Sequence, residues 1–208
     1  LTATQQGNQP REVTDEQLLL RYTQGDTGAF DTLVGRYRSP LYAFLARFLG
    51  DRALAEDIFQ ETFLQVHLSA EGFDVTRRLK PWLFTIAANK ARDALRSRSR
   101  RPAAELDAQV GSDDGGRATS YADLMAGDFP PPGESLENRE AATSVRTVVG
   151  TLPDHLREVL LLAYFQQFPY KQIAEILDLP LGTVKSRLHV AVKEFARRWK
   201  AAQGAGLE

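Results

Sequence analysis

Hydrophobic residues recur every three or four positions along the first hundred residues, which is the period of a helix packed on one side. Thr14 opens the pattern and Gln17 follows three residues later, a pair that is typical of a helix N-terminus. Breaks fall at Gly25-Asp26 and Gly50-Asp51, and Pro40 is expected to start a new helix between them. We therefore predict five helices: one from Thr14, one carrying Phe30 to Tyr37, one from Pro40 to Phe48, one at about 52–68 and one at about 81–97.

The periodicity stops between residues 102 and 134, where Gly, Pro, Ser and Asp are frequent and apolar residues are few. That composition is typical of a flexible linker. Helical spacing then returns and predicts four helices at about 136–150, 154–164, 169–177 and 181–201. The expected fold class is all-α, with a loose tail at residues 1–13, a helical domain at 14–101, a flexible acidic linker at 102–134 and a second helical domain at 135–203.

The stretch from Ile173 to Phe195 has the pattern of a helix-turn-helix. A short helix meets the tight turn Asp178-Leu179-Pro180, and a longer helix follows with Val184, Leu188 and Ala191 on its apolar side. In this motif the second helix enters the major groove of DNA. Its other side carries the polar residues that could contact DNA: Thr183, Lys185, Ser186, His189 and Lys193.

The alternative for this stretch is an ordinary helical corner with a solvated charged side. The further bases Arg197, Arg198 and Lys200 favour DNA. Val190 interrupts the polar side with a group that cannot donate a hydrogen bond. It either contacts a thymine methyl or packs on the preceding helix.

Charge is distributed unevenly along a chain whose net charge is only −1. Six bases and one acid lie in residues 90–101, nine acids and two bases lie in residues 102–140, and six bases and one acid lie in residues 185–200. The total therefore gives no sign of nucleic-acid binding, whereas the basic–acidic–basic order does.

The first basic stretch lies on the fifth predicted helix. Leu83, Ala87, Ala91 and Ala94 mark its buried side. Six bases exceed what a helix C-terminus needs to complement its dipole, so nucleic acid is favoured over a solvated helix end. Trp82 either stacks on a base or, as its spacing to Ile86 favours, joins the core. The candidate nucleic-acid contacts share the opposite side of this helix at positions i, i+3, i+4 and i+7: Asn89, Arg92, Asp93 and Arg96.

Another polar face is acidic. Asp57, Gln60 and Glu61 share one side of the fourth predicted helix. The face could meet a basic protein surface, remain solvated, or hold a carboxylate pair for catalysis. No partner histidine, metal set or Gly-rich loop accompanies it, so catalysis is disfavoured.

The remaining composition excludes several classes. The chain has no cysteine and three scattered histidines, so neither a disulfide scaffold nor a thiolate or histidine metal cluster is expected. No apolar run approaches the ~18 residues of a membrane span, and no signal peptide is evident. We expect a cytoplasmic protein that is not an enzyme, with no cofactor and no membrane insertion.

Three stretches together resemble a known family. "AEDIFQETF", "PWLFTIAANKARDALR" and "GTVKSRL" after "IAEIL" occur in the order and spacing of sigma factors of the extracytoplasmic-function (ECF) type. These are the smallest of the subunits that direct bacterial RNA polymerase to promoters. The resemblance covers about residues 14–101 and 135–200.

The resemblance implies a role for each domain. The first would read the promoter −10 element, with a flipped base captured by the loop at about 70–80, and the second would read the −35 element. Implied −10 contacts are Lys80, Asn89, Arg92, Asp93 and Arg96. Implied −35 contacts are Thr183, Lys185, Ser186, His189 and Lys193. Asp57, Gln60 and Glu61 would bind core RNA polymerase.

The implied partners are core RNA polymerase, through its β′ clamp helices and its β subunit, promoter DNA and an anti-sigma factor, with no homo-oligomer required. One departure is Val190, because members commonly carry "SRLHRA" where this chain has "SRLHVA".

Two other function classes stay open. A stand-alone helix-turn-helix regulator would need a dimer interface, and no spare apolar helix supplies one. An adaptor that binds polymerase or an anti-sigma factor without reading DNA would not need the bases around Asn89 and Lys185.

Overall fold

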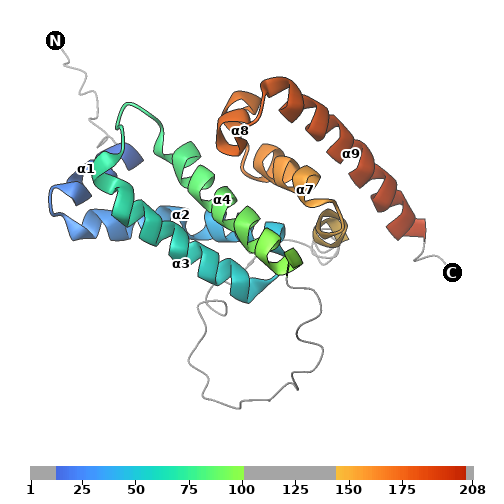
Figure 1. Cartoon of the computed structure of the whole chain (residues 1–208), viewed down its shortest axis with the longest axis horizontal. Coiled ribbons are helices and arrows are strands. Elements are labelled where there is room, and N and C mark those ends of the chain that lie inside the picture. The colour runs from blue at the N-terminus through green and yellow to red at the C-terminus, as the bar shows by residue number, and fades with distance from the viewer. Residues whose placement is uncertain (1–12, 101–143, 205–208) are drawn as a thin grey trace, which may run out of the picture.

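A computed structural model describes residues 13–100 and 144–204, and every regular element in these two ranges is helical. The linker expected at 102–134, the tail before Val13 and the start of the second domain lie outside the described residues. Figure 1 shows two groups of helices, α1–α4 and α7–α9, lying side by side. The elements are α1 (Asp15–Thr23), α2 (Thr27–Leu49), α3 (Arg52–Ser69), the 3₁₀ turn η1 (Ala70–Gly72), α4 (Leu79–Arg100), helical residues 144–150, α7 (Asp154–Leu160), the π-helical turn η2 (Leu161–Phe165), α8 (Tyr170–Leu177) and α9 (Leu181–Gly204).

Local side-chain caps set the first helix boundaries. The Thr14 hydroxyl accepts a hydrogen bond from the Gln17 amide at 3.3 Å, and the Gln17 side chain accepts one from the Thr14 amide at 3.0 Å. This is the reciprocal capping box that the sequence predicted. Asp26 and Asp51 cap α2 and α3 with one hydrogen bond each, which the carboxylate accepts from the backbone amide three residues later.

One predicted boundary is wrong, because α2 runs without a break through Pro40. Proline inside a helix removes one backbone hydrogen bond and costs ~3 kcal/mol. The buried stripe continues across the proline, however, from Leu33 and Tyr37 to Leu41, which are 1, 5 and 0% exposed. Packing of this continuous stripe against the core outweighs the local preference to stop.

The first unit, defined here as residues 13–100, has a core rich in aromatic side chains. Phe44, Phe48 and Phe84 are each at most 1% exposed, and the Phe44 ring stacks on Phe48 with centroids 5.8 Å apart. Helix α2 contacts α1, α3 and α4, so it lies at the centre of this unit. Leu83, Ala87 and Ala91 are fully buried, as their spacing predicted.

The second unit, defined here as residues 144–204, contains the predicted helix-turn-helix. Helix α8 packs on α9, and Val184, Leu188 and Ala191 of α9 are at most 4% exposed. The turn between them has Asp178 in the left-handed region at a φ of 51°, and Leu179 packs on the core. The helix predicted at 154–164 is present, although its last turn, η2, is π-helical.

The two units contact each other directly. Helix α8 lies against α4, and η2 and α7 lie against α2 (Figure 1). The sequence predicted two domains on a flexible linker and gave no sign of this contact, which involves residues far apart in the chain.

Candidate nucleic-acid interface

The basic face of α4 has most of the predicted side chains on one strip. Asn89, Asp93 and Arg96 are exposed, and Arg92 is half-buried. Arg92 donates a hydrogen bond to the side-chain oxygen of Asn89, and Arg96 lies 3.4 Å from a carboxylate oxygen of Asp93. The internal pairs hold two arginines along the strip, where they can meet phosphates.

Lys80 is not part of this strip. It precedes Asn89 by nine residues, about two and a half helical turns, which places it on the opposite side of α4. Its ammonium donates to the backbone oxygen of Gln166 at 3.2 Å and lies 4.8 Å from the centroid of the Phe168 ring. Burial lowers the pKa of Lys80. The structure therefore separates Lys80 from the other residues predicted with it.

The loop before α4 forms one wall of an open hollow against α1. Asp74 orders this loop by accepting hydrogen bonds from the backbone and hydroxyl of Thr76 at 2.9 and 2.7 Å. These bonds lower the pKa of Asp74. The backbone amide of Leu79 donates to Glu16 of α1 at 2.9 Å, which fixes the start of α4. The hollow is lined by Thr14, Glu16, Gln17, Leu20, Val75, Thr76, Arg77 and Arg78.

Sequence reasoning named this loop but missed its two cations, Arg77 and Arg78, and the exposed apolar residues Leu20 and Val75. The adjacent Arg-Arg pair was the available signal. Trp82 lies beside this loop, half-buried, with its ring centroid 4.6 Å from that of Phe73. Because it also packs on the core, the structure favours the core alternative for Trp82.

The predicted polar face of α9 is open to solvent. Lys185, Ser186, His189 and Lys193 are exposed, and Thr183 is half-buried. The Ser186 hydroxyl donates to the backbone oxygen of Thr183 at 3.0 Å. Val190 is 49% exposed on this outward face, so it is not a core residue.

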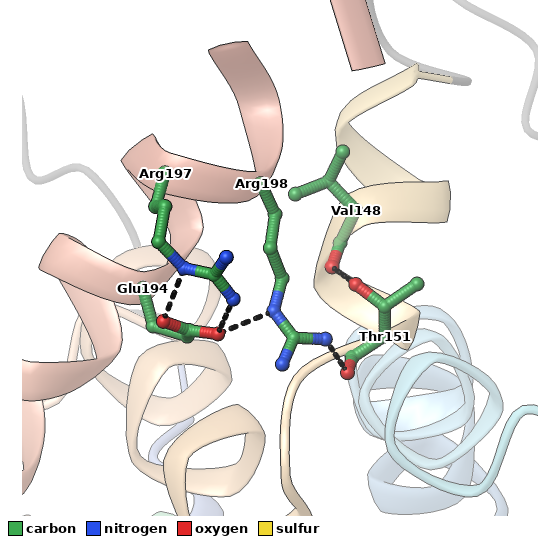
Figure 2. A network of polar contacts seen from close by, with 5 residues as sticks. All are labelled: Val148, Thr151, Glu194, Arg197 and Arg198. Atoms are coloured by element: carbon green, nitrogen blue, oxygen red, sulfur yellow. Dashed lines mark hydrogen bonds and ion pairs between the residues drawn. The ribbon is translucent and has the colours of Figure 1, made fainter. Parts of the chain in front are cut away.

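The C-terminal half of α9 is anchored by a polar network, shown in Figure 2. Glu194 accepts from Arg197 at 2.6 and 3.0 Å and from Arg198 at 2.7 Å. Arg198 also donates to the backbone oxygen of Thr151, whose hydroxyl donates to Val148. Hydrogen bonds from Arg197, then those from Arg198, lower the pKa of Glu194 to about 2. Of the two bases that the sequence counted toward DNA binding, Arg198 therefore joins α9 to Thr151, while Arg197 pairs within α9.

The acidic face of α3 is exposed and carries apolar residues as well. Asp57 and Gln60 are exposed, and Glu61 accepts from Lys90 of α4 at 3.1 Å. Leu64 and Leu68 continue the same face at helical spacing, and their side chains are 57 and 68% exposed. Sequence reasoning missed both leucines, although their spacing from Gln60 and Glu61 was the signal. An exposed leucine pair beside acids is typical of a protein-binding surface.

Within residues 13–100 and 144–204, no helix has the length and apolar character that crossing a membrane requires.

Comparison with known families assigns both units. The Sigma-70 region 2 family matches residues 33–101, and the Sigma-70 region 4 family matches residues 142–195. The order of the two matches is that of the two helical units.

Individual relatives cover most of the chain. The ECF RNA polymerase sigma factor SigW of Bacillus subtilis is 33% identical over 86% of this chain and 92% of its own length. The RNA polymerase sigma-H factor of Pseudomonas aeruginosa is 32% identical over 84% of this chain and 88% of its own length.

Solved structures agree on the fold. CnrH, in complex with the cytosolic domain of CnrY, has a TM-score of 0.63 with 23% identity, covering 90% of this chain and 97% of that one. From these matches, and from the two helical units that carry them, the chain belongs to the ECF family of RNA polymerase sigma factors, which direct promoter-specific transcription.

Proposed function

We propose that this chain binds core RNA polymerase and directs it to promoters by reading the −35 element with α9 and the −10 element with the first unit. The observation that carries the proposal is the division of α9 into two faces. Val184, Leu188 and Ala191 are buried, while Lys185 and His189 are exposed. A helix fixed in this manner on a stable unit can enter a major groove without rearranging.

In the −35 contact, we expect the first turns of α9 to contact the bases. The side chains of Lys185, Ser186 and His189 supply donors for base edges or phosphates. Thr183 and Lys193 flank them and would contact the DNA backbone. Each good base contact contributes ~1–3 kcal/mol of discrimination, so one such helix is weakly selective by itself.

In the −10 contact, the strip of α4 and the hollow beside α1 act together. Asn89 offers an amide for a base edge, and Arg92 and Arg96 offer charge for phosphates. A base leaving the stack costs a few kcal/mol, which contacts in a pocket must offset. Arg77 and Arg78 place cations at the hollow where the phosphates of an unstacked strand would lie.

The α3 face is the proposed polymerase contact, through Asp57, Gln60 and Glu61 with Leu64 and Leu68 at its apolar centre. We propose that this face binds the β′ clamp helices and that the second unit binds the β subunit. When one polymerase holds both units, binding of the first unit to its promoter element makes binding of the second unit intramolecular. Two contacts that are each weakly selective then give selective promoter binding together. The solved structure of the sigma factor RpoE from Bartonella quintana is a complex with the anti-sigma factor NepR, which supports a corresponding anti-sigma partner here. A cytoplasmic location and a non-enzymatic role follow from this assignment.

The test is a pull-down with core RNA polymerase, followed by run-off transcription on promoters selected from a random library. We expect the wild-type chain to bind core and to support promoter-dependent transcripts. The double variant Asp57→Ala/Leu64→Ala should weaken core binding, whereas Asp31→Ala, an exposed acid on α2, should not. Failure of the wild-type chain to bind core would refute the proposal. A DNA-bound homodimer formed without polymerase would instead favour the stand-alone regulator.

A further inference from the structure

The second residue of α9, the helix proposed to read the −35 element, is a glycine. Gly182 is exposed and helical. A Cβ at this position would have no atom of the described residues within 4 Å, and the φ of Gly182 lies outside the left-handed region. Glycine is also the poorest helix former after proline. Neither the backbone conformation nor the packing of the protein therefore requires a glycine here.

Gly182 begins the row of exposed residues proposed to contact DNA. Ser186, His189 and Lys193 follow it at i+4, i+7 and i+11, which places them along one line of the helix surface. All of them are exposed, like Gly182. The side chains lengthen along this row, from none at Gly182 through serine and histidine to lysine. This gradient fits a helix that lies closest to the DNA at its N-terminal end and farther from it with each turn.

The dimensions of the major groove leave little room at this end. An α-helix with its side chains is about 10–12 Å across, and the groove is about 12 Å wide. A helix that enters by its N-terminal end can therefore approach the base edges most closely where it carries no side chain. Ser186 depends on a close approach, because its hydroxyl is attached directly to Cβ, whereas the long side chain of Lys193 can reach DNA from farther away.

An exposed helical glycine does not by itself indicate a ligand. Gly35 in α2 is also exposed, and a Cβ there would likewise have no atom of the described residues within 4 Å. Gly182 differs from Gly35 in its place at the head of the row of DNA contacts. We propose that Gly182 is a positioning residue for the −35 contact, because the missing side chain lets the start of α9 approach the base edges closely enough for Ser186 to contact them. This inference rests on the proposed function of α9.

The test uses the full chain assembled with core RNA polymerase. Gly182→Ala and Gly182→Leu add side chains of increasing size, keep the backbone amide and have similar helix propensities. Gly35→Ala and Gly35→Leu make the same changes at a helical position outside the proposed DNA contacts. Thermal unfolding, followed by far-UV circular dichroism, is measured first. All four midpoints should stay at the wild-type value or rise by up to about 4 °C, because each change replaces an exposed glycine by a better helix former.

Run-off transcription is then measured on a selected promoter and on the same promoter with its −35 element scrambled. On the intact promoter, Gly182→Leu should lower transcription about fivefold or more, which is the effect of one lost base contact. Gly182→Ala should lower it by less, and the Gly35 variants should transcribe as the wild-type chain does. On the scrambled promoter all five chains should give the same low level. Pull-down of core polymerase should be equal for all of them.

A second substitution tests whether Gly182 acts through Ser186. Ser186→Ala should lower transcription by the wild-type chain and have no further effect in the Gly182→Leu chain, because the helix there no longer brings residue 186 to the base edges. Lys193→Ala should lower transcription in both backgrounds, since lysine reaches farther. A purely structural role of Gly182 would leave the effect of Ser186→Ala the same in both.

Gly182 variants that transcribe like their Gly35 counterparts from the intact promoter would overturn the inference, as would a full Ser186→Ala effect in the Gly182→Leu chain. A lowered unfolding midpoint in Gly182→Ala would also overturn it, because the fold itself would then require the glycine. A wild-type chain that does not bind core polymerase, or that transcribes equally from both promoters, would instead refute the proposed function. The two failures are therefore distinguishable.

Discussion

Helix α9 presents Lys185 and His189 to solvent, whereas α4 has Arg92 beside a buried glutamate of the other unit. In the sequence the two helices carry equal numbers of bases over similar lengths. The difference in the structure is that two cations of α4, Lys80 and Arg92, lie at the contact between the units, while Lys185 at the start of α9 is exposed. Similar charge patterns can therefore describe one face that is open to solvent and another that the neighbouring unit partly covers.

The exposed face of α9 keeps its position because the opposite face is buried. Truncation of a buried side chain on α9 should therefore give the largest expected effect, a loss of stability. Leu188→Ala removes a side chain that is 4% exposed and should destabilise the second unit by about 2–5 kcal/mol. Chemical denaturation of the full chain, followed by far-UV circular dichroism, measures the loss. His189→Ala, the next residue on the exposed side, is the control and should change stability by less than about 0.5 kcal/mol. Equal losses in the two variants would contradict the assignment of faces.

The next largest effect is expected on transcription from the promoter. Lys185→Ala should lower run-off transcription from a selected promoter about tenfold or more, because a lost base contact costs ~1–3 kcal/mol. Binding to core polymerase should stay unchanged. Arg197→Ala is the comparison, since this arginine pairs with Glu194 and is not proposed to touch DNA. A larger transcription defect in Arg197→Ala than in Lys185→Ala would reverse the roles given to the two ends of α9.

The α4 side of the comparison should respond to pH. Burial raises the pKa of Glu158 from 4.5 to about 7, and Arg92, Arg187 and Arg96 oppose that rise, while Asp154 adds to it. An acid whose pKa is raised in the folded protein holds its proton there after the unfolded chain has lost it. The contribution of Glu158 to stability is therefore fully present below about pH 4.5 and is lost as the pH rises to about 7.

The free energy of unfolding, measured by urea denaturation from pH 5 to pH 8, should fall as the pH rises to about 7. Glu158→Gln keeps the shape of the side chain and removes the titration, so its free energy of unfolding should fall less over the same window. A wild-type profile that rises with pH would contradict the placement of Glu158 in the contact.

The smallest effect concerns Val190, which lies on the exposed face of α9. Val190→Arg adds a cation near the DNA backbone, so DNA affinity should rise and the slope of log K against log salt should steepen by about 1. Val190→Leu is the control, since it adds no charge. An unchanged slope in the arginine variant would place residue 190 away from the phosphates.

Much of the fold was predictable because its causes are local. Thr14 and Asp51 cap helices through residues three positions away, and the α9 stripe follows from helical spacing alone. The helix boundary predicted at Pro40 is wrong because the tendency of proline to end a helix is outweighed by the packing of a buried stripe against other helices. The contacts of Lys80 and Arg92 with the second unit join residues dozens of positions apart, and no periodic pattern indicates such a contact.

The network at the end of α9 has a mechanical consequence. Helix α9 has 24 residues and is one continuous rod about 36 Å long at 1.5 Å per residue. Arg198, which also pairs with Glu194, joins its far half to the backbone oxygen of Thr151 (Figure 2), directly after helical residues 144–150. Lys185 lies 13 residues, about 20 Å along the helix, from Arg198, so a rotation of the second unit by about 10° about Arg198 would move Lys185 by about 3 Å. A partner pulling near Thr151 could in this way change which bases Lys185 and His189 reach.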